Sequence, residues 1–467
     1  MHLIKHIIVW SFFLAISLSS NCFATRVNVD TKERQSHITP ANVAKHSGTA
    51  QRNETFVRST ENQVQDGEMH IADSARIVLG QEGLKIESSN GKFKLRLGGR
   101  LHADASFSRH EDFLDANGNR IETNNGTEMR RGRIGFEGTV FSDWNYKGQL
   151  EFAGDEVELK DLWTRYTGLA LANITLGEQK QAFSRELQES SNDMLFIERS
   201  AMNVINGAIV DRAVGLNLSS HGQSWAGQVG IYGDSIATKK RQIGADKGWA
   251  ISSRVTFTPL HEKNRLIHLG VAGNFREPNE VDTALAPSLS LASKSTNMSN
   301  LSLISTLIEN IDNIKMLGLE ASGILGPFSI GAEYTNSWIN RKNDESDLKF
   351  NGWYGEAAWT LTGESRHYRR GNFFRVIPTN SFSFLNGGTG AWELAVRYAE
   401  ADLNDGHFKG GKLTNLTIAL NWYLNHNIRL MAGYDRALKI TDSSLTKLDG
   451  NNPKNLNTFM FRAQVAF

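Results

Sequence analysis

The stretch that decides the fold is Phe93–Phe107, which reads FKLRLGGRLHADASF. Apolar residues stand at positions 93, 95, 97, 101, 103 and 107, and charged or polar residues stand at 94, 96, 100, 102 and 104. Successive side chains of a β-strand point to opposite faces, so this stretch presents one apolar face and one charged face. In a soluble sheet the apolar face would pack on a core. In a membrane barrel it would face lipid, and the charged face would line a water-filled lumen.

The same alternation recurs along the chain and predicts an all-β transmembrane barrel of sixteen antiparallel strands. An even number of strands is the rule for bacterial barrels, and the seven prolines all fall outside the predicted strands. Apolar faces that begin or end in Trp or Tyr are typical of the aromatic girdle at a membrane interface. Residues 83–88, which precede the turn signal Asn90-Gly91, are compatible with a further short strand at the barrel entrance. The predicted spans are 92–108, 130–140, 144–153, 157–166, 172–180, 212–219, 225–233, 249–258, 265–276, 316–325, 328–338, 353–362, 392–401, 415–424, 428–437 and 457–467.

The lengths of the connections support this interpretation, because barrels have short periplasmic turns and long outer loops. If Phe467 ends a strand that descends to the periplasm, the short segments 141–143, 326–327 and 425–427 fall on the periplasmic side. One connection, 363–391, is long although it is assigned to the periplasm. The long connections assigned to the outside are 109–129, 181–211, 234–248, 277–315 and 438–456.

Both ends of the chain point to export into the outer membrane. Residues 1–24 contain Lys5, an apolar stretch from 7 to 18 and a small-residue site for cleavage after Ala24, which predicts a signal peptide. Acylation of Cys22 as in a lipoprotein is disfavoured, because Ser19-Ser20-Asn21 is a poor match to that signal. Residues 25–82 are polar and are expected to form a flexible periplasmic extension, followed by the barrel domain at 83–467. The alternation that ends in Phe467 resembles the signal that barrel assembly machinery reads.

The composition excludes several other classes of protein. The formal net charge of +1 argues against a nucleic-acid binder, and a single cysteine provides neither a disulfide framework nor a thiol nucleophile in the mature chain. The mean hydropathy of -0.37 is compatible with a barrel, in which half of each strand faces water. The chain has no metal-binding spacing among its 13 histidines, no nucleophile elbow and no phosphate-cradling glycine loop. We therefore expect no catalytic residue, no metal, no cofactor and no enzymatic activity.

Several long stretches resemble the phosphate-selective porins of the O/P type over nearly all of 83–467. These stretches are RRGRIGFEG at 130–138, VELKD at 157–161, RYTG at 165–168, GPFS at 326–329, LTGESR at 361–366 with YRRG at 368–371, and NWYLN at 421–425. The resemblance implies a homotrimeric, sixteen-stranded porin whose third outer loop folds into the lumen, where arginines and lysines bind anions. That loop corresponds to 181–211, and Gln179 and Arg185 depart from the family's pattern. The residues of the loop that match the pattern are Phe183, Ser184, Glu186, Ser190, Glu198, Arg199 and Ser200.

The alternation assigns a set of cations to the lumen as a candidate anion pathway. Arg96, Arg100, Arg131 and Arg133 belong to the first two predicted strands and therefore share one wall. Cations gathered on a low-dielectric wall raise the local concentration of anions, and the planar guanidinium suits phosphate oxygens. The alternative is that these arginines pair with inward carboxylates such as Glu137 and Glu151 and only brace the wall. The inward cations are Lys94, Arg96, Arg100, Arg131, Arg133, Lys147, Arg254, Arg276 and Arg397.

Arg366, Arg369 and Arg370 lie on the long periplasmic connection, where they would form a basic exit for anions or a solvated basic loop. The leading hypothesis is an outer-membrane porin for passive diffusion of small anions, with phosphate or polyphosphate as the expected class. The alternatives are a general non-selective porin, a barrel whose long loops (277–315 above all) bind a partner, and a barrel hydrolase. The expected partners are outer-membrane lipid, small anions, two further copies of the chain and the assembly machinery, and no nucleic acid.

Overall fold

The computed structural model describes residues 75–467 and the two-residue strand β1 (Thr55–Phe56), with gaps at 110–112, 116–117, 122, 155, 237–247, 279–287, 300, 444, 448–449 and 451–455. The predicted signal peptide at 1–24 and most of the predicted extension at 25–82 lie outside the described residues, as does part of the connection 277–315.

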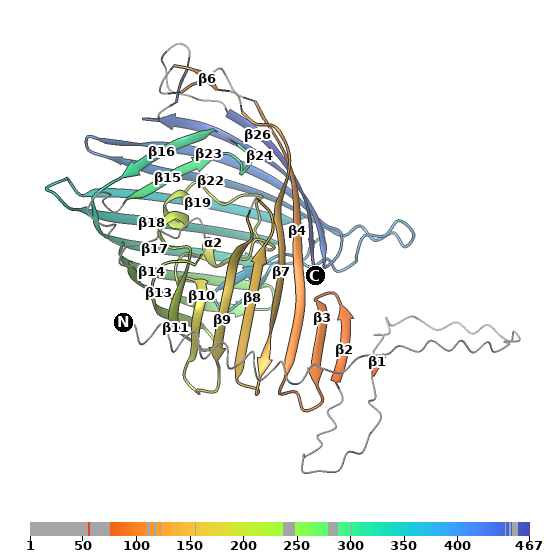
Figure 1. Ribbon diagram of the computed structural model, residues 1–467. Coiled ribbons are helices and arrows are strands. Elements are labelled where there is room, and N and C mark those ends of the chain that lie inside the picture. Colours follow the sequence, from red (N-terminus) through yellow and green to blue (C-terminus); the bar gives the residue numbers. More distant parts are fainter. Residues whose placement is uncertain are drawn as a thin grey trace, which may run out of the picture. The chain divides into compact units, whose positions relative to one another are not determined.

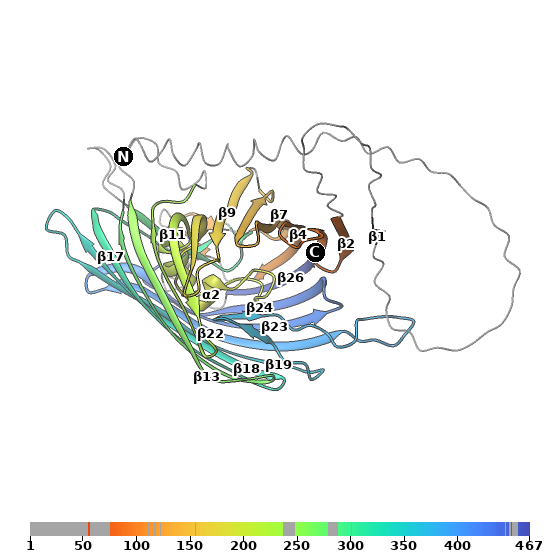
Figure 2. The same ribbon diagram turned by 90° about the horizontal axis from the view of Figure 1, so that it is seen from below.

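Sixteen antiparallel strands form a closed barrel, and each strand overlaps its predicted span (Figures 1 and 2). The largest difference is at β23, which begins at Phe408 and not at the predicted residue 415. Each strand pairs with the next one in the ring, and β26 closes it by pairing with β4 along Asn457–Ala466 and Arg100–Arg109. The strands are β4 (Lys94–Arg109), β7 (Gly126–Val140), β8 (Trp144–Glu151), β9 (Glu158–Tyr166), β10 (Asn173–Lys180), β11 (Arg212–His221), β12 (Trp225–Tyr232), β13 (Trp249–Glu262), β14 (Arg265–Glu277), β17 (Ile311–Leu325), β18 (Phe328–Arg341), β19 (Leu348–Thr360), β22 (Ala391–Asp405), β23 (Phe408–Tyr423), β24 (Ile428–Thr441) and β26 (Leu456–Ala466).

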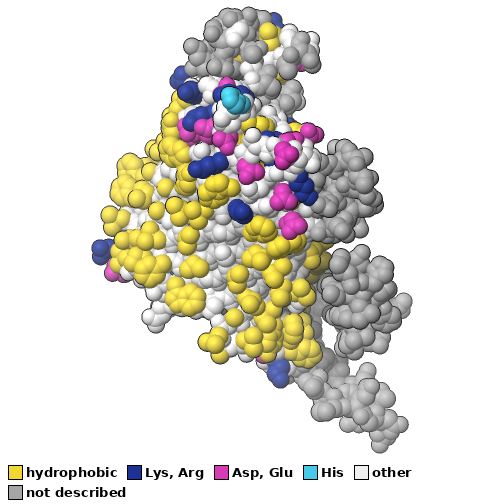
Figure 3. Space-filling view, turned by 90° about the vertical axis from the view of Figure 1, so that its left-hand side faces the viewer, with side chains coloured by type: hydrophobic (Ala, Val, Ile, Leu, Met, Phe, Trp, Pro, Cys, Tyr) yellow, Lys and Arg dark blue, Asp and Glu magenta, His cyan; other side chains and the backbone are white. Residues whose placement is uncertain are grey.

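The outer face of the barrel is apolar because the alternation of the sequence places one apolar set outside. Along β13, for example, Ile251, Val255 and Phe257 are exposed while the residues between them are mostly buried. Figure 3 shows hydrophobic side chains spread over the face in view, with charged side chains gathered toward one end. Aromatic pairs lie at strand ends, such as Trp144 with Tyr166 and Trp392 with Trp422, in the positions of an interfacial girdle.

Pro259 differs from the expectation that every proline falls outside a strand. β13 continues to Glu262, and Pro259 lies where its register with β14 shifts between Phe257 and Leu260. Proline is tolerated at such a bulge, because the ladder there does not use its missing N–H.

A short hairpin extends the sheet below the closure. β3 (Gly83–Ser88) pairs with the start of β4, and β2 (Ala75–Gly80) pairs with β3. The expected short strand at 83–88 is therefore present. The expected boundary at residue 83 divides this hairpin, since the last residues of the polar extension already form β2.

Several short elements lie within the long connections, and the sequence alternation did not predict them. Segment 181–211 contains α2 (Arg185–Gln188) and α3 (Asn203–Ile209), and the connection 361–390 contains β20 (His367–Arg369) and β21 (Asn372–Phe374). A small sheet joins β5 (Phe113–Leu114), β6 (Arg120–Ile121) and β25 (Thr446–Lys447). Neither described helix has the length and apolar character needed to span a membrane.

The described part of the connection 277–315 packs apolar side chains against the barrel. It contains β15 (Leu289–Lys294) and β16 (Ser302–Ile308), and Leu291 and Ile304 are fully buried. They belong to one apolar cluster with Met202, the N-cap residue of α3, and Phe350 of β19. This packing favours a structural role for β15 and β16 over a loop that presents its apolar residues to a partner.

The closure of the barrel leaves no room for a side chain at Gly98. A Cβ added there would lie 2.5 Å from the carbonyl oxygen of Phe467, the residue whose backbone hydrogen-bonds to Gly99 in both directions. We expect Gly98→Val to destabilise the barrel by about 1–3 kcal/mol, the usual cost of overpacking. Heat-modifiable electrophoretic mobility across a urea series measures it. Gly355→Val is the matched control, since nothing lies within 4 Å of its added Cβ. Equal midpoints for the two variants would contradict this account of the closure.

Candidate functional site

Segment 181–211 is bound to inward-facing side chains of the strand wall. Glu333 of β18 accepts hydrogen bonds from the Ser184 hydroxyl (2.8 Å) and from the backbone N–H groups of Arg185 (2.9 Å) and Glu186 (2.7 Å). The Tyr354 hydroxyl of β19 donates to the same carboxylate (2.5 Å). One wall carboxylate therefore holds the start of α2 with three bonds.

Charged pairs extend this attachment. Arg185, which departs from the family's pattern, forms a buried ion pair with Glu356 of β19 at 2.5 Å. Glu186 turns back on its own segment, where its carboxylate accepts from the backbone N–H and the hydroxyl of Ser200, both at 2.7 Å. Arg397 of β22 lies 3.3 Å from Glu186. Removing either member of such a buried pair would leave an uncompensated charge.

Three arginines on three different strands donate hydrogen bonds to backbone carbonyls of the same segment. Arg429 of β24 donates to the carbonyl of Met194 (2.9 Å), and Arg462 of β26 donates to the carbonyl of Ile197 (2.8 Å). Arg397 donates to the carbonyl of Glu198 (3.0 Å). Arg429 and Arg462 are absent from the predicted cation set, although the alternation of β24 and β26 places both on the inward face.

Glu198 is the second charged anchor of the segment. Arg130 of β7 donates to it at 2.8 and 3.3 Å, and Arg462 lies 3.3 Å away. Burial alone would raise the pKa of Glu198, but the charges of Arg130 and Arg462 outweigh it and hold that pKa well below its ordinary value. Arg130 reaches the lumen because β7 bulges there: His102 pairs with Arg131 and Ala103 with Met129.

The long connection 361–390, which the sequence assigned to the periplasmic side, contributes a second set of contacts, with segment 181–211 and with the strand wall. Arg366 forms a buried ion pair with Glu189 at 2.6 Å, and the Tyr368 hydroxyl lies 2.9 Å from Nδ1 of His268 on β14. Arg254 of β13 donates to the carbonyl of Gly371 (2.9 Å). The exceptional length of this connection therefore serves contacts with the wall and with segment 181–211.

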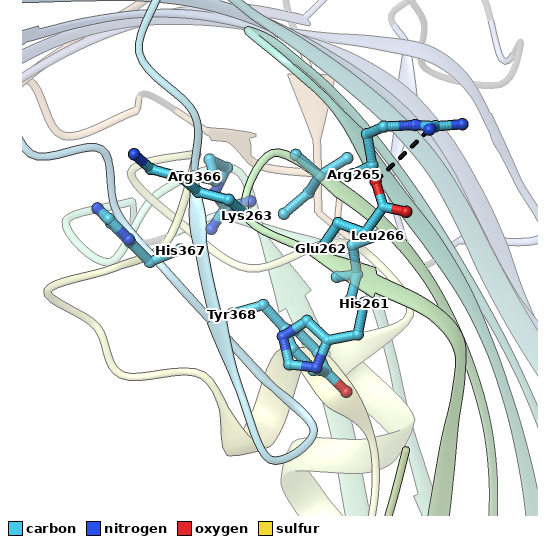
Figure 4. A pocket seen from close by; sticks show the side chains of 9 residues that line it. His261, Glu262, Lys263, Arg265, Leu266, Arg366, His367 and Tyr368 are labelled. Atoms are coloured by element: carbon cyan, nitrogen blue, oxygen red, sulfur yellow. Dashed lines mark hydrogen bonds and ion pairs between the residues drawn. The ribbon is translucent and has the colours of Figure 1, made fainter. Parts of the chain in front are cut away.

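Figure 4 shows the pocket of about 310 Å³ beside this second segment, with His261 and Tyr368 lying close together. His367 and Arg366 line it from the connection, and Lys263 lines it from the β13–β14 turn. Arg366 is buried and paired, whereas Arg369 and Arg370 are exposed. Of the three arginines expected at a basic exit, the latter two are the ones open to solvent.

Most of the predicted lumen cations are paired with carboxylates. This is the arrangement that the bracing alternative described, and it applies to seven of the nine residues. The pairs are Lys94 with Glu87 (2.8 Å), Arg96 with Glu137 (3.0 Å), Arg133 with Glu151 (2.5 Å), Lys147 with Asp161 (3.5 Å), Arg254 with Glu320 (2.7 Å), Arg276 with Asp234 (3.5 Å) and Arg397 with Glu186 (3.3 Å).

Arg100 and Arg131 differ, because within the described parts of the chain neither forms an ion pair with a carboxylate. Arg100 donates to the hydroxyls of Ser190 (3.2 Å) and Ser191 (3.0 Å) of segment 181–211. Arg131 is 6% exposed, and its Nε and Nη1 have no hydrogen-bond partner among the described residues. A cavity of about 80 Å³ lies along the same wall, and Arg96, Arg100 and Lys147 are among the residues that line it.

Other cations of the site, Lys180 and Arg199 among them, also bind only neutral groups in the described structure. Lys180, at the end of β10, donates to the carbonyls of Gln188 and Glu189, each at 3.0 Å. Arg199 donates to the carbonyls of Glu186 (3.2 Å) and Glu189 (3.3 Å).

Phe183, another predicted residue of the segment, is fully buried and lies close to Gly318 of β17, where it would contact an added Cβ. No group of three or more metal-ligating side chains comes together within the described ranges.

A closed sixteen-stranded barrel with a charged inner face defines a porin of the outer membrane of Gram-negative bacteria. The family model described as phosphate-selective porin O and P matches residues 95–467, and the chain belongs to this family. Porin O of Pseudomonas aeruginosa is 26% identical over 428 residues, which cover 85% of this chain and 93% of that protein.

Two further similarities agree with this assignment. An uncharacterized protein of Caulobacter vibrioides is 30% identical over 318 residues, which cover 66% of this chain and 62% of that protein. Among solved structures, the anion-selective porin from Comamonas acidovorans has a TM-score of 0.51 at 15% identity, with 80% of this chain and 100% of the other covered. This last likeness shows the shared fold.

The role of Glu333 as an anchor leads to a proteolysis experiment. Glu333→Ala would leave several buried donors without an acceptor, so we expect the attachment of segment 181–211 to weaken by about 3–5 kcal/mol. Trypsin cleavage after Arg185 or Arg199, followed by mass spectrometry, measures release of the segment. Glu345→Ala removes a carboxylate from the connection after β18 and serves as the control. Resistance equal to that of the parent protein would show that Glu333 is not a major anchor.

The low pKa of Glu198 predicts how its contribution to stability depends on pH. A carboxyl group with a depressed folded-state pKa stabilises the protein above its unfolded pKa of about 4.3, and this contribution is lost as the pH falls through the lower folded value. The melting temperatures of the parent and Glu198→Gln should therefore differ by a constant amount from about pH 8 to about pH 5, and converge below about pH 4. Thermal unfolding in detergent measures both. Convergence that begins near neutral pH would be inconsistent with a depressed pKa.

Proposed function

We propose that this protein is an outer-membrane channel for passive diffusion of small anions, with phosphate or polyphosphate as the preferred class, and that segment 181–211 forms its constriction. The observation that carries the proposal is the pair Arg100 and Arg131, which form no ion pair with a carboxylate of the described chain. Arg100 and Arg131 are also among the residues that the sequence assigned to the anion pathway.

The surrounding charges support anion passage over cation passage. Three carboxylates of segment 181–211 form ion pairs with arginines: Glu186 with Arg397, Glu189 with Arg366, and Glu198 with Arg130 and Arg462. The cations Arg100, Arg131, Lys180 and Arg199 have only neutral hydrogen-bond partners, or none, in the described structure. Where cations without an ion-pair partner lie beside carboxylates that are already paired, the local field attracts anions, and several sites of moderate strength let the ion leave again.

The names of the relatives point in the same direction. The family is described as phosphate-selective, and one structural neighbour is an anion-selective porin. Guanidinium groups bind phosphate oxygens through paired N–H donors, so Arg100 beside the small cavity suits an oxyanion.

A general porin without selectivity is the second candidate, and one observation favours it. Seven of the nine predicted lumen cations are neutralised by carboxylates, so that most of the wall contributes little net field. The two candidates differ in whether Arg100 and Arg131 attract the passing anion, as they would in the selective channel and would not in the general porin.

We further infer a homotrimer, an association with outer-membrane lipid, a cleaved leader at 1–24 and a periplasmic extension at 25–82. The family supports the trimer, and the apolar outer face supports contact with lipid. The last strand, β26, with its terminal Phe467 supports recognition by barrel assembly machinery. Particle mass in detergent and the N-terminal sequence of the exported protein test the trimer and the cleavage, and deletion of Phe467 should lower the inserted amount.

The reversal potential in a KCl gradient across a planar bilayer, followed by titration with phosphate, tests the channel. The parent should prefer chloride and show current block by phosphate. In Arg100→Gln/Arg131→Gln the reversal potential should move toward zero. The phosphate needed for half block should rise about fivefold per charge removed, because a unit charge at about 4 Å in water is worth about 1 kcal/mol.

Lys315→Gln is the control, since it removes a charge from the outer face of β17. Its selectivity should equal that of the parent. A parent without chloride preference or phosphate block would establish the general porin. If the double variant were as selective as the parent, Arg100 and Arg131 would not be part of the anion pathway.

A further inference from the structure

The connection before β22 contains an apolar hairpin whose tip packs neither on the barrel wall nor on the segments inside the lumen. Residues 376–392, VIPTNSFSFLNGGTGAW, contain no Asp, Glu, Lys or Arg. Phe384 and Leu385 at the tip are 92% and 95% exposed, the highest values among the large apolar residues that are described. In Figure 1 this segment is the blue loop that extends away from the strands at the right of the picture.

The hairpin has a defined turn at its tip. The backbone N–H of Ser383 donates to the carbonyl of Gly388 (2.9 Å), and the N–H of Asn386 donates to the Ser383 hydroxyl (3.1 Å). Gly387 adopts a φ of 69°, which a side chain would disfavour. The base is fixed by the N–H of Phe382, which donates to the carbonyl of Leu424 just beyond β23 (2.6 Å). The exposed tip is therefore presented by a hydrogen-bonded turn.

The aromatic side chains of the hairpin continue those on the outer face of the barrel. Trp392 stacks on Trp422 with ring centroids 4.7 Å apart, Phe382 packs edge-on against Trp422 at 5.0 Å, and Phe384 packs against Phe382 at 4.7 Å. Trp422 follows Ile418 and Leu420 on the lipid-facing side of β23. An unbroken row of aromatic rings thus runs from the girdle of the barrel to the tip of the hairpin.

We propose that the hairpin Phe382–Gly388 is a membrane anchor, which inserts Phe384 and Leu385 into the periplasmic leaflet of the outer membrane. Aromatic and aliphatic side chains at a membrane interface are stabilised when their apolar parts leave water, and a segment without charges enters that interface at low cost. Phospholipid is the occupant that the observations favour, because the aromatic row is continuous with the lipid-facing surface. A second copy of the chain is the competing occupant.

Fluorescence of a labelled Leu385→Cys protein, reconstituted in phosphatidylcholine and phosphatidylglycerol vesicles, tests the anchor. An environment-sensitive probe at position 385 should emit at shorter wavelength than in water, and nitroxide-labelled phospholipid should quench it at least about threefold more than a probe at Ser346→Cys. Ser346 is exposed in the connection after β18. The parent protein, treated in parallel, reports any labelling at Cys22, and heat-modifiable mobility verifies folding of each variant.

Emission at the wavelength found in water, or quenching no greater than at position 346, would overturn the proposal. A blue-shifted probe that lipid nitroxide does not quench would also overturn it. If that shift persists in detergent while the particle mass corresponds to several chains, the hairpin covers a neighbouring copy. Blue-shifted emission with strong lipid quenching in vesicles establishes the anchor.

Discussion

The whole structure depends on the closure of the sheet between β26 and β4. Within a bilayer no water is present to satisfy backbone N–H and C=O groups, so a sheet that crosses it must have no free edge. The last strand pairs with the first barrel strand over ten residues, and Phe467 joins Gly99 just below. Once the ring is closed, the alternation of each strand separates an apolar outside from a charged inside.

This separation creates the second constraint, which is the charge of the lumen. Charges on the inner wall are compensated by partners that neighbouring strands or inward segments provide. Two connections meet there. Segment 181–211 is held by Glu333 and by arginines of β22, β24 and β26, and connection 361–390 is joined to it through Arg366 and Glu189. Of the nine predicted lumen cations, the two that have no carboxylate partner in the described structure, Arg100 and Arg131, lie on the wall of β4 and β7.

Proteins that bury many charges place most of them in pairs, and the few unpaired ones are candidates for function. In this barrel one wall contains both kinds of arginine, those paired with a carboxylate and those without one. Arg133 braces the wall through Glu151, while Arg100, its register partner across β4 and β7, bonds only to serine hydroxyls of the loop. Whether the charge of an arginine is paired therefore depends on its position in the strand register and on the segment that lies against it.

The sequence by itself determined the sixteen strands and their faces, because a period of two residues encodes which side chains share a face. It also placed all nine predicted lumen cations on strands of the barrel. The charge partners were decided only by the tertiary structure, because they come from residues distant in the chain, such as Asp104 beside Arg462. The bulge in β7 shows the limit of the alternation. A strict two-residue period places Met129 inside and Arg130 outside. Because of the one extra residue, Arg130 instead points inward to Glu198 and Met129 is exposed on the outer face. Likewise, the family's pattern treats Arg185 as a departure, and only the fold shows that it meets Glu356.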